Sequence, residues 1–407
     1  MRKLICLFLW TTGLYFSPWP AAANPADSDC LFSWAERTYP QFFSPAGGIS
    51  ASYAQYYYRF YSGTGNYLAT SSANDHVYVL APDYGTVPID VGTAADFLAS
   101  AGCLASSVAG IAERYPGDAN IQRDPDVLFA EMAEEATLAE LFANWDSNST
   151  ANSVAIDTTT WPANSPGRQS IRLFTTAGPL GSGTVRAAGL YKYFPNSTDG
   201  TVFARWYVKY NTTGTFHHSG PRVGGSYPPS STVPGAIAGI RPNGSDFFSL
   251  GAELSQGKTG PTKRSTVDFY NYWMHQRGTS YYPGIYYGNS FINSPEVAIN
   301  TGEWNCIEVQ LTLNDPVSGY TGEIAMWING VEVSRVKQGT VGTWTEDNFQ
   351  PDTAGTPFEG FQWRSDQNLK WNYFQLMHFV DNDPTGLVNS VNYDHIVVAR
   401  KYIGPIH

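Results

Sequence analysis

Phenols and basic groups alternate with apolar residues in two segments typical of β-strands. In segment 202–210, Arg205, Tyr207 and Lys209 share one face, opposite an apolar face that contains Trp206. In segment 267–275, Tyr270 and Tyr272 share a face with Asp268, opposite Phe269 and Trp273. Successive side chains of a strand point to opposite sides, so each segment presents one polar face. A tyrosine can act as a base near neutral pH only if close cations lower its pKa from about 10. We therefore predict that Lys209, Arg205, Tyr270 and Tyr272 line one groove.

A second group of proton-transferring side chains lies in a loop. His217 and His218 follow a turn, and Arg222 is four residues further on. Adjacent residues of an extended segment point to opposite faces, so we expect at most one of the two histidines to reach the groove. That histidine is a candidate base or carboxylate ligand, with a hydrogen-bonded loop histidine as the alternative.

Two further polar residues are weaker candidates for binding a substrate. Arg241 ends a predicted strand just before Pro242, where it is either a subsite cation or a surface charge. Gln310 lies on the polar face of segment 304–313 and is a candidate for neutralising a carboxylate.

The composition is that of a sparsely charged, aromatic chain. Its 407 residues include 24 Lys and Arg, 35 Asp and Glu, and 39 Gly, which gives a formal net charge of -11. Charged residues make up 14% and aromatic residues 15%, so the chain can bury a core and is not a disordered protein. The acidic balance argues against a nucleic-acid partner, and the low content of charged residues argues against a coiled coil. The composition is typical of a secreted β-rich protein that binds glycans.

The first residues have the pattern of an export signal. Arg2 and Lys3 precede a short apolar stretch, and small residues around Ala22 offer a cleavage site, so residues 1–23 are predicted to be a signal peptide. The apolar stretch is too short to span a membrane. We expect a protein that is secreted, periplasmic or on the cell surface of a bacterium. Export favours a disulfide between Cys30 and Cys103, with Cys306 as a buried free thiol.

The cysteines also bound a small domain. Residues 30–103 combine helical patterns at 31–43 and 93–101 with three short strands at 56–61, 66–71 and 76–80, an α+β module that a disulfide would close. Its role is open between an accessory function and a plain spacer. Residues 104–115 are predicted to be a linker, and residues 116–407 a second domain.

The second domain is a succession of short strands, with a hairpin signal at Asn329-Gly330. A helix is expected at 130–142, after an initial strand at 126–130. This pattern predicts a mainly β fold, an antiparallel jelly roll or β-sandwich. The predicted strands are 170–175, 185–194, 202–210, 236–241, 247–254, 267–275, 304–313, 323–327, 331–333, 371–380 and 393–402.

Four stretches of this domain resemble concanavalin A-like jelly-roll polysaccharide lyases, in particular alginate and glucuronan lyases. They are FARWYVKY (203–210), GEWNCIEV (302–309), EIAMWINGVEV (323–333) and NYDHIVVAR (392–400). The resemblance implies β-elimination on a uronate-containing polysaccharide, and Lys209 with Tyr270 and Tyr272 is similar to the Lys and Tyr-x-Tyr arrangement of one such family. Because Tyr272 shares a face with Tyr270 opposite apolar residues, we expect it to be the favoured base or acid. One of His217 or His218 would be the second proton-transfer group or help to neutralise the carboxylate. Substrate contacts would come from Arg205, Tyr207, Arg222, Arg241 and Gln310.

Two other functions stay open. The same groove could bind glycans without cleaving them, or a carboxylate pair not evident in the sequence could make the protein a glycoside hydrolase. Jelly-roll glucanases carry Glu-x-Asp-x-Glu or Glu-x-Asp-x-x-Glu on one strand, and no such triplet occurs here. No cofactor is expected, although Asp381-Asn382-Asp383 could hold a structural calcium ion instead of forming a solvated turn. We expect a monomer whose partner is an acidic polysaccharide.

Overall fold

The computed structural model describes residues 110–407, apart from 149–151, 177–186, 198–199, 213–215, 233–237, 257–264, 294–296, 298, 300, 381–383 and 385, and three earlier strands. The chain divides into two compact units, Met1–Ser107 and Val108–His407. Within the described residues, no helix is long and apolar enough to cross a membrane.

In the first unit, the strands β1 (Tyr67–Thr70), β2 (His76–Leu80) and β3 (Ile89–Thr93) form an antiparallel sheet in that order. The predicted strands 66–71 and 76–80 correspond to β1 and β2. The predicted signal peptide, the two helices of the module, its first strand, and Cys30 and Cys103 lie outside the described residues.

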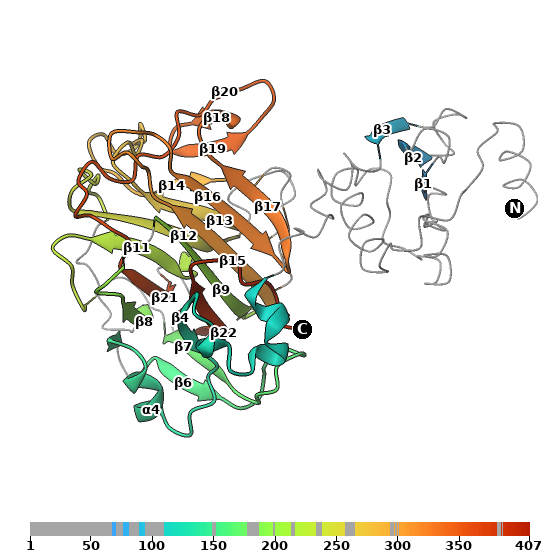
Figure 1. The fold of residues 1–407 in the computed structure, drawn as a ribbon, viewed down its shortest axis with the longest axis vertical. Helices are drawn as coiled ribbons and strands as arrows, with labels where there is room; N and C mark the ends of the chain where they lie inside the picture. The colour runs from blue at the N-terminus through green and yellow to red at the C-terminus, as the bar shows by residue number, and fades with distance from the viewer. Residues whose placement is uncertain are drawn as a thin grey trace, which may run out of the picture. The chain divides into compact units, whose positions relative to one another are not determined.

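The second unit is a sandwich of two large sheets (Figure 1). The eleven-stranded sheet has the order β20-β18-β19-β14-β13-β12-β11-β21-β8-β5, with β10 paired to β21, and it is antiparallel except for the β14–β19 pair. Its strands are β5 (Ser147–Asn148), β8 (Ala187–Tyr193), β10 (His218–Ser219), β11 (Arg222–Ser226), β12 (Phe247–Gln256), β13 (Ser265–Tyr272), β14 (Asn289–Phe291), β18 (Val341–Thr345), β19 (Asn348–Pro351), β20 (Thr356–Pro357) and β21 (Tyr373–Phe379).

The eight-stranded sheet has the order β17-β16-β15-β9-β22-β7-β6, with β4 paired to β22. Its strands are β4 (Val127–Glu131), β6 (Val154–Asp157), β7 (Ser170–Thr176), β9 (Thr201–Tyr210), β15 (Asn305–Thr312), β16 (Glu323–Ile328), β17 (Val331–Val336) and β22 (Val388–Ala399). The prediction of a mainly β, two-sheet architecture is confirmed.

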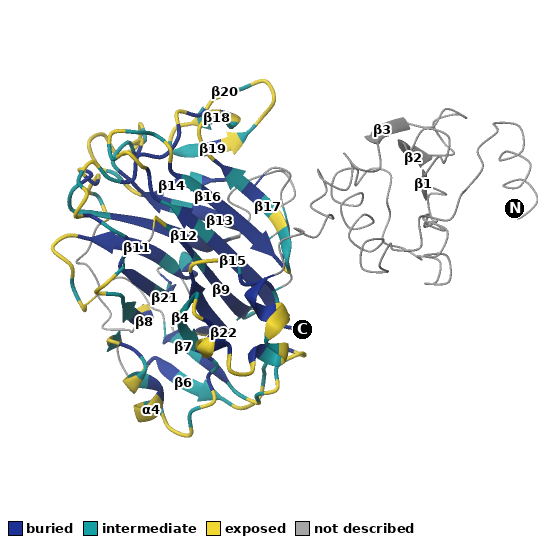
Figure 2. Ribbon diagram, in the orientation of Figure 1, coloured by how far each residue is buried: buried dark blue, intermediate teal, exposed yellow. Residues whose placement is uncertain are grey.

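The core lies between the two sheets, where their apolar faces meet. The strands are buried over most of their length while the exposed residues lie mainly in the connecting loops (Figure 2). Alternation predicts the inward side of each strand correctly, since one face of every strand must be removed from water. The predicted inward residues are all buried in one core cluster: Trp206, Val208, Val267, Phe269, Ile307, Val309 and Leu311.

The predicted hairpin has the expected two-residue turn. Ile328 pairs with Val331, and the turn residues Asn329 and Gly330 have φ angles of 52° and 82°. Positive φ at both positions is what a type I′ turn requires, and Asn-Gly adopts it at low cost.

The helix predicted at 130–142 is wrong over most of its length. Residues up to Glu131 belong to β4, where Glu131 pairs with Ile396, so the sheet takes the first part of the segment. Only α4 (Leu138–Ala143) is helical, and it starts at a capping box in which Thr137 and Glu140 exchange hydrogen bonds. Three short 3-10 helices precede β4: η4 (Ile111–Arg114), η5 (Pro116–Asp118) and η6 (Ile121–Arg123).

Two other segments differ from their expected structure. In place of the strand expected at 236–241, the described residues 238–241 make an isolated bridge between Gly239 and Tyr286. Within the stretch predicted as a linker, Ile111 and Ala112 are buried, and the Ala112 N–H donates to the carbonyl of Ile403 over 2.8 Å.

Candidate functional site: a cleft on the eleven-stranded sheet

The outer face of the eleven-stranded sheet carries a cluster of titratable side chains. In β12 the residues Phe248, Leu250, Ala252 and Leu254 belong to the core cluster, so Glu253 lies on the outer face. Cross-strand pairing places Glu253 opposite Asp268, and Tyr270 opposite Gly251. A cleft of about 280 Å³ opens here. It is lined by His217, His218, Glu253, Leu254, Asp268, Phe269, Tyr270, Ser290, Ile292 and Asn348.

Glu253 binds a histidine and an arginine of this cluster. Its Oε2 lies 2.7 Å from Nδ1 of His218, and its Oε1 accepts a hydrogen bond of 2.8 Å from Nη2 of Arg222. Burial alone would raise the pKa of this carboxyl, but the charges of His218 and Arg222 outweigh burial and lower the pKa to about 2. An ionised carboxylate can only accept, so Nδ1 of His218 carries the proton. When His218 is neutral, its lone pair is therefore on Nε2.

Two tyrosines of β13 lie beside this pair. The Tyr270 ring is 5.0 Å from the His218 ring and 5.7 Å from the Tyr272 ring. Burial raises the pKa of both phenols. Tyr270 borders the cleft, whereas Tyr272 is 3% exposed and is not among the residues that line it. Tyr270 is therefore the phenol that a ligand can reach.

Gly288 fixes the position of the Tyr270 ring. Its N–H donates to the Tyr270 hydroxyl over 2.8 Å. A Cβ at this position would lie 2.5 Å from the Tyr270 ring, so only glycine allows the backbone to come this close. The backbone hydrogen bond and the close contact together hold the hydroxyl at the cleft.

The two histidines do not behave as alternation predicts. His217 and His218 stack with their ring centroids 4.1 Å apart, and both line the cleft. The expectation that at most one reaches the groove is wrong, because β10 begins only at His218 and His217 precedes it outside regular strand geometry.

The predicted groove shared by Arg205 and Lys209 with Tyr270 and Tyr272 is also wrong. β9 and β13 belong to different sheets, and their apolar faces meet in the core, so their polar faces point away from each other. The sequence predicts that Lys209 and Arg205 lower the pKa of Tyr272. Burial instead raises this pKa, and neither Lys209 nor Arg205 acts on it. Lys209 instead donates to Thr160 over 3.0 Å on the outer side of the eight-stranded sheet.

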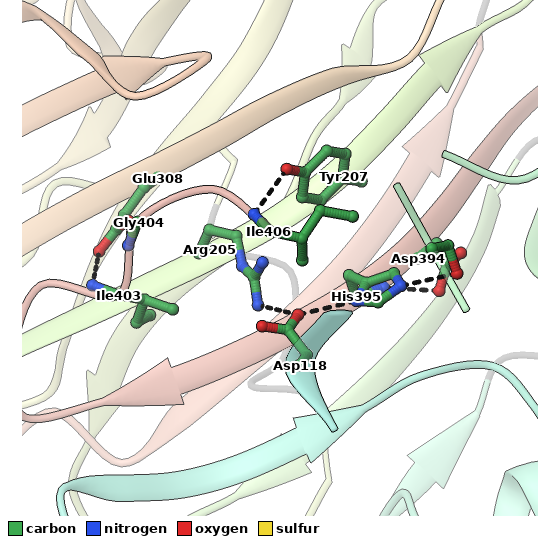
Figure 3. Close-up of polar contacts among 10 residues, drawn as sticks. Asp118, Arg205, Tyr207, Glu308, Asp394, His395, Ile403, Gly404 and Ile406 are labelled. Atoms are coloured by element: carbon green, nitrogen blue, oxygen red, sulfur yellow. Dashed lines mark hydrogen bonds and ion pairs between the residues drawn. The ribbon is translucent and has the colours of Figure 1, made fainter. Parts of the chain in front are cut away.

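Arg205 and Tyr207 are buried, and they make polar contacts with Asp118 and Ile406 (Figure 3). Arg205 is fully buried, and its Nη2 lies 2.5 Å from Oδ2 of Asp118. The Tyr207 hydroxyl accepts a hydrogen bond of 2.9 Å from the N–H of Ile406, and burial raises the pKa of this phenol. Neither side chain is placed to contact a polysaccharide.

Two other predicted substrate contacts lie away from the cleft. Gln310 is on β15 of the eight-stranded sheet and donates to the Thr312 hydroxyl over 2.9 Å. Arg241 is exposed in a loop, with its guanidinium 4.9 Å from the centroid of the Tyr286 ring. Of the predicted site residues, the structure brings together His217, His218, Arg222, Tyr270 and Tyr272.

Sequence reasoning missed the residue that organises the cluster. Glu253 lies in segment 247–254, where alternation with Phe248, Leu250 and Leu254 would have placed it on the outer face. Its two partners come from β10 and β11, so the sequence offers no local signal for the pairing. Among the described residues, no group of three or more His, Cys, Asp and Glu side chains could hold a metal ion. The calcium candidate 381–383 lies outside these residues.

Solved structures similar to the chain include alginate lyases, the class that the sequence resembles. A lyase from Aplysia kurodai is 14% identical over 67% of this chain and 98% of its own, with a TM-score of 0.44. The lyase vAL-1 from Chlorella virus is 12% identical over 68% of this chain and 100% of its own, with a TM-score of 0.43. A cellulose-induced protein, Cip1, is 16% identical over 62% and 87%, with a TM-score of 0.33. Neither a protein-family model nor a curated protein matches the chain.

Proposed function

We propose that the protein is an exported polysaccharide lyase of the jelly-roll kind, and that the cleft on the eleven-stranded sheet cleaves a uronate-containing polymer by β-elimination. This reaction needs a base for the C5 proton, an acid for the departing O4, and positive charge beside the carboxylate. The observation that carries the proposal is the ionised Glu253, which holds Nδ1 of His218 while the His218 ring lies 5.0 Å from the Tyr270 ring.

His218 is the base of this mechanism. Its Nδ1–H donates to Glu253, so the lone pair on Nε2 is available to take the C5 proton. The imidazolium that forms stays next to the carboxylate of Glu253, which stabilises its charge. Glu253 does not touch the substrate in this scheme and acts by orienting His218.

Tyr270 is the acid. Burial raises its pKa, so the phenol keeps its proton at neutral pH and can donate it to O4 as the C4–O4 bond breaks. The Gly288 N–H, which already donates to this oxygen, then stabilises the phenolate. The electron pair of the C5–H bond becomes the C4–C5 double bond. The products are an unsaturated uronate end and a free hydroxyl on the other fragment.

Arg222 supplies positive charge for the substrate carboxylate. Its Nη2 is bound to Glu253, and Arg222 is not among the residues that line the cleft. Arg222 would therefore act on a bound carboxylate through its charge and not through a direct hydrogen bond. The net charge of -11 disfavours long-range attraction of a polyanion. Binding of an acidic polymer would therefore depend on local positive charge such as that of Arg222.

A glycoside hydrolase fits the same cleft less well. Glu253 and Asp268 face each other across β12 and β13, as a carboxylate pair of a hydrolase could. A hydrolase needs one carboxyl with a raised pKa as its acid, whereas the pKa of Glu253 is lowered to about 2. Asp268 is already the acceptor of hydrogen bonds from the Thr266 hydroxyl and the Asn293 N–H.

The experiment incubates the purified protein with alginate, glucuronan and a neutral glucan. We expect ultraviolet absorbance from unsaturated ends with at least one of the two uronate polymers and none with the glucan. Binding to a uronate polymer without this absorbance would favour a glycan-binding protein. New reducing ends without absorbance would favour the hydrolase.

A further inference from the structure

A serine, a histidine and an aspartate form a continuous hydrogen-bonded chain at the eight-stranded sheet, with the histidine on one of its strands. The Oγ atom of Ser165 lies 2.8 Å from Nε2 of His395, and Nδ1 of His395 lies 2.7 Å from Oδ2 of Asp118. These residues come from three distant segments of the sequence, which the fold brings together. A catalytic triad is defined by two contacts: the nucleophile contacts the base, and the base contacts the carboxylate that orients it.

The charge on Asp118 determines which nitrogen of His395 is basic. Asp118 is fully buried and lies between Arg205 and His395 (Figure 3). Burial acts to raise the pKa of this carboxyl, but Arg205 and His395 outweigh it and lower the pKa. The ionised carboxylate accepts the proton of Nδ1, so the lone pair of the neutral ring is on Nε2. Ser165 must then donate its hydroxyl proton to Nε2, which is the arrangement that activates a serine.

His395 is held in this position by an unusual backbone. Its φ angle is 46°, in the left-handed region that side chains rarely adopt. The pairing of β22 with β9 shifts register between Asp394 and Val397, so His395 sits in an irregularity of the strand. Such irregularities re-aim a side chain out of the ladder and are found beside active sites. The His395 N–H donates to the Asp394 carboxylate over 2.7 Å, which stabilises the bend.

The serine is less buried than its two partners. Ser165 is half-buried, and its neighbours Asn164 and Pro166 are exposed. The Gly167 N–H donates to the Ser165 hydroxyl oxygen over 3.0 Å, so that oxygen accepts one hydrogen bond while it donates another. Ser165 thus lies where the buried pair of His395 and Asp118 meets the exposed loop.

The residues after Ser165 already bind an oxyanion. The N–H groups of Arg168 and Gln169 both donate to Oε1 of Glu134, over 2.8 and 3.1 Å. Two adjacent backbone donors of this kind are what an oxyanion hole provides for a tetrahedral intermediate. Glu134 is exposed, so its carboxylate can leave these donors to a substrate oxygen.

We propose that Ser165 is the nucleophile of a second active site, which hydrolyses small acyl esters. Oγ bonds to the acyl carbon while Nε2 of His395 takes its proton, and that proton then leaves with the alcohol as the ester bond breaks. Water, deprotonated by the same nitrogen, cleaves the acyl-serine and releases the acid and Ser165. Ester and water are thereby converted to acid and alcohol with no other reactant.

This site is independent of the cleft proposed to act on uronate polymers. Arg205 and His395 lie on strands of the eight-stranded sheet, and His218 and Tyr270 on strands of the other sheet. The outer faces of a two-sheet sandwich point in opposite directions. Loss of one activity therefore leaves the other in place.

The test treats the folded protein with a fluorophosphonate, which modifies activated serines, and measures hydrolysis of p-nitrophenyl acetate. We expect one phosphonyl group per chain, on the peptide that contains Ser165, and none after the protein is denatured first. Ser165→Ala should lose the label and at least about 10²-fold of the hydrolysis rate. Ser245→Ala is the matched control, because that hydroxyl donates to the side-chain oxygen of Asn243 and not to an imidazole, and it should keep both.

Absence of label at Ser165 in the folded, unsubstituted protein overturns the proposal, and this measurement does not depend on whether any variant folds. Hydrolysis by Ser165→Ala at the unsubstituted rate also overturns it. Either result would leave Ser165 and His395 as structural partners only.

Discussion

Nδ1 of His218 lies 2.7 Å from Oε2 of Glu253, and the other carboxylate oxygen of Glu253 binds Arg222. One buried carboxylate thus fixes the tautomer of a histidine and the position of a guanidinium on the same side of the sheet. The three side chains come from β10, β11 and β12, so the cluster exists only when these strands pair. This relationship makes the cleft a candidate for proton transfer and not only for glycan binding.

Replacing Glu253 should affect both activity and stability. Glu253→Gln removes the charge that orients His218 and leaves the buried Arg222 without a counter-ion. We expect a loss of at least about 10²-fold in the rate of unsaturated-end formation. The free energy of unfolding should fall by about 3–5 kcal/mol in urea denaturation.

Glu332→Gln is the matched control for this variant. Glu332 pairs with Arg335 on the surface, with 37% of its side chain exposed. Its loss should change the free energy of unfolding by less than about 1 kcal/mol. Equal stabilities of the two variants would contradict the role assigned to Glu253.

Gly288→Ala should displace Tyr270. The added methyl group would lie 2.5 Å from the ring, so the phenol or the loop must move. We expect the rate of elimination to fall by at least about 10-fold, because small displacements of a catalytic group are costly. Gly200→Ala, where a Cβ meets nothing within 4 Å, should leave the rate unchanged. A fully active Gly288→Ala enzyme would exclude Tyr270 as the acid.

Glu308 should make the protein less stable as the pH rises. Burial raises its pKa from 4.5 to about 7, although the N–H groups of Ile403 and Gly404 act in the opposite direction. The folded state therefore keeps this proton where the unfolded chain releases it. The stability it contributes is complete below about pH 4.5 and is lost as the pH rises through about 7.

The measurement is the free energy of unfolding as a function of pH, between about pH 4.5 and 7, for the unsubstituted protein and for Glu308→Gln. The variant cannot titrate at this position, so the difference between the two proteins should change by up to about 1.4 kcal/mol per pH unit. A difference that stays constant with pH would show that Glu308 is ionised in the folded protein.

The cysteines offer a test of export and of the first unit. Cys306 is a buried free thiol, and burial raises its pKa to about 12. If residues 1–23 are removed on export and Cys30 pairs with Cys103, thiol titration of the denatured, non-reduced mature protein should find one free thiol. Three free thiols would contradict the disulfide.

The sequence predicts which side chains of a strand point into the core and which point outward. It does not predict which other segments pack against the outward side. Alternation correctly buried Trp206 and Phe269 and put Tyr270 and Arg205 on polar faces, because each strand must hide one side from water. It could not tell that β9 and β13 lie in different sheets, since that depends on the order of strand pairing. The polar face of β9 thus predicts a groove residue at Arg205, whereas this side chain is fully buried and paired with Asp118.

The most direct test of the central claim compares Tyr270→Phe with Tyr272→Phe on a uronate polymer that the unsubstituted protein cleaves. Each substitution removes one hydroxyl from the same strand and keeps the ring, but only Tyr270 borders the cleft. We predict that Tyr270→Phe lowers the initial rate of ultraviolet absorbance increase by about 10²-fold or more, and that Tyr272→Phe lowers it less. A Tyr270→Phe protein that forms unsaturated ends at the unsubstituted rate would contradict the proposed mechanism.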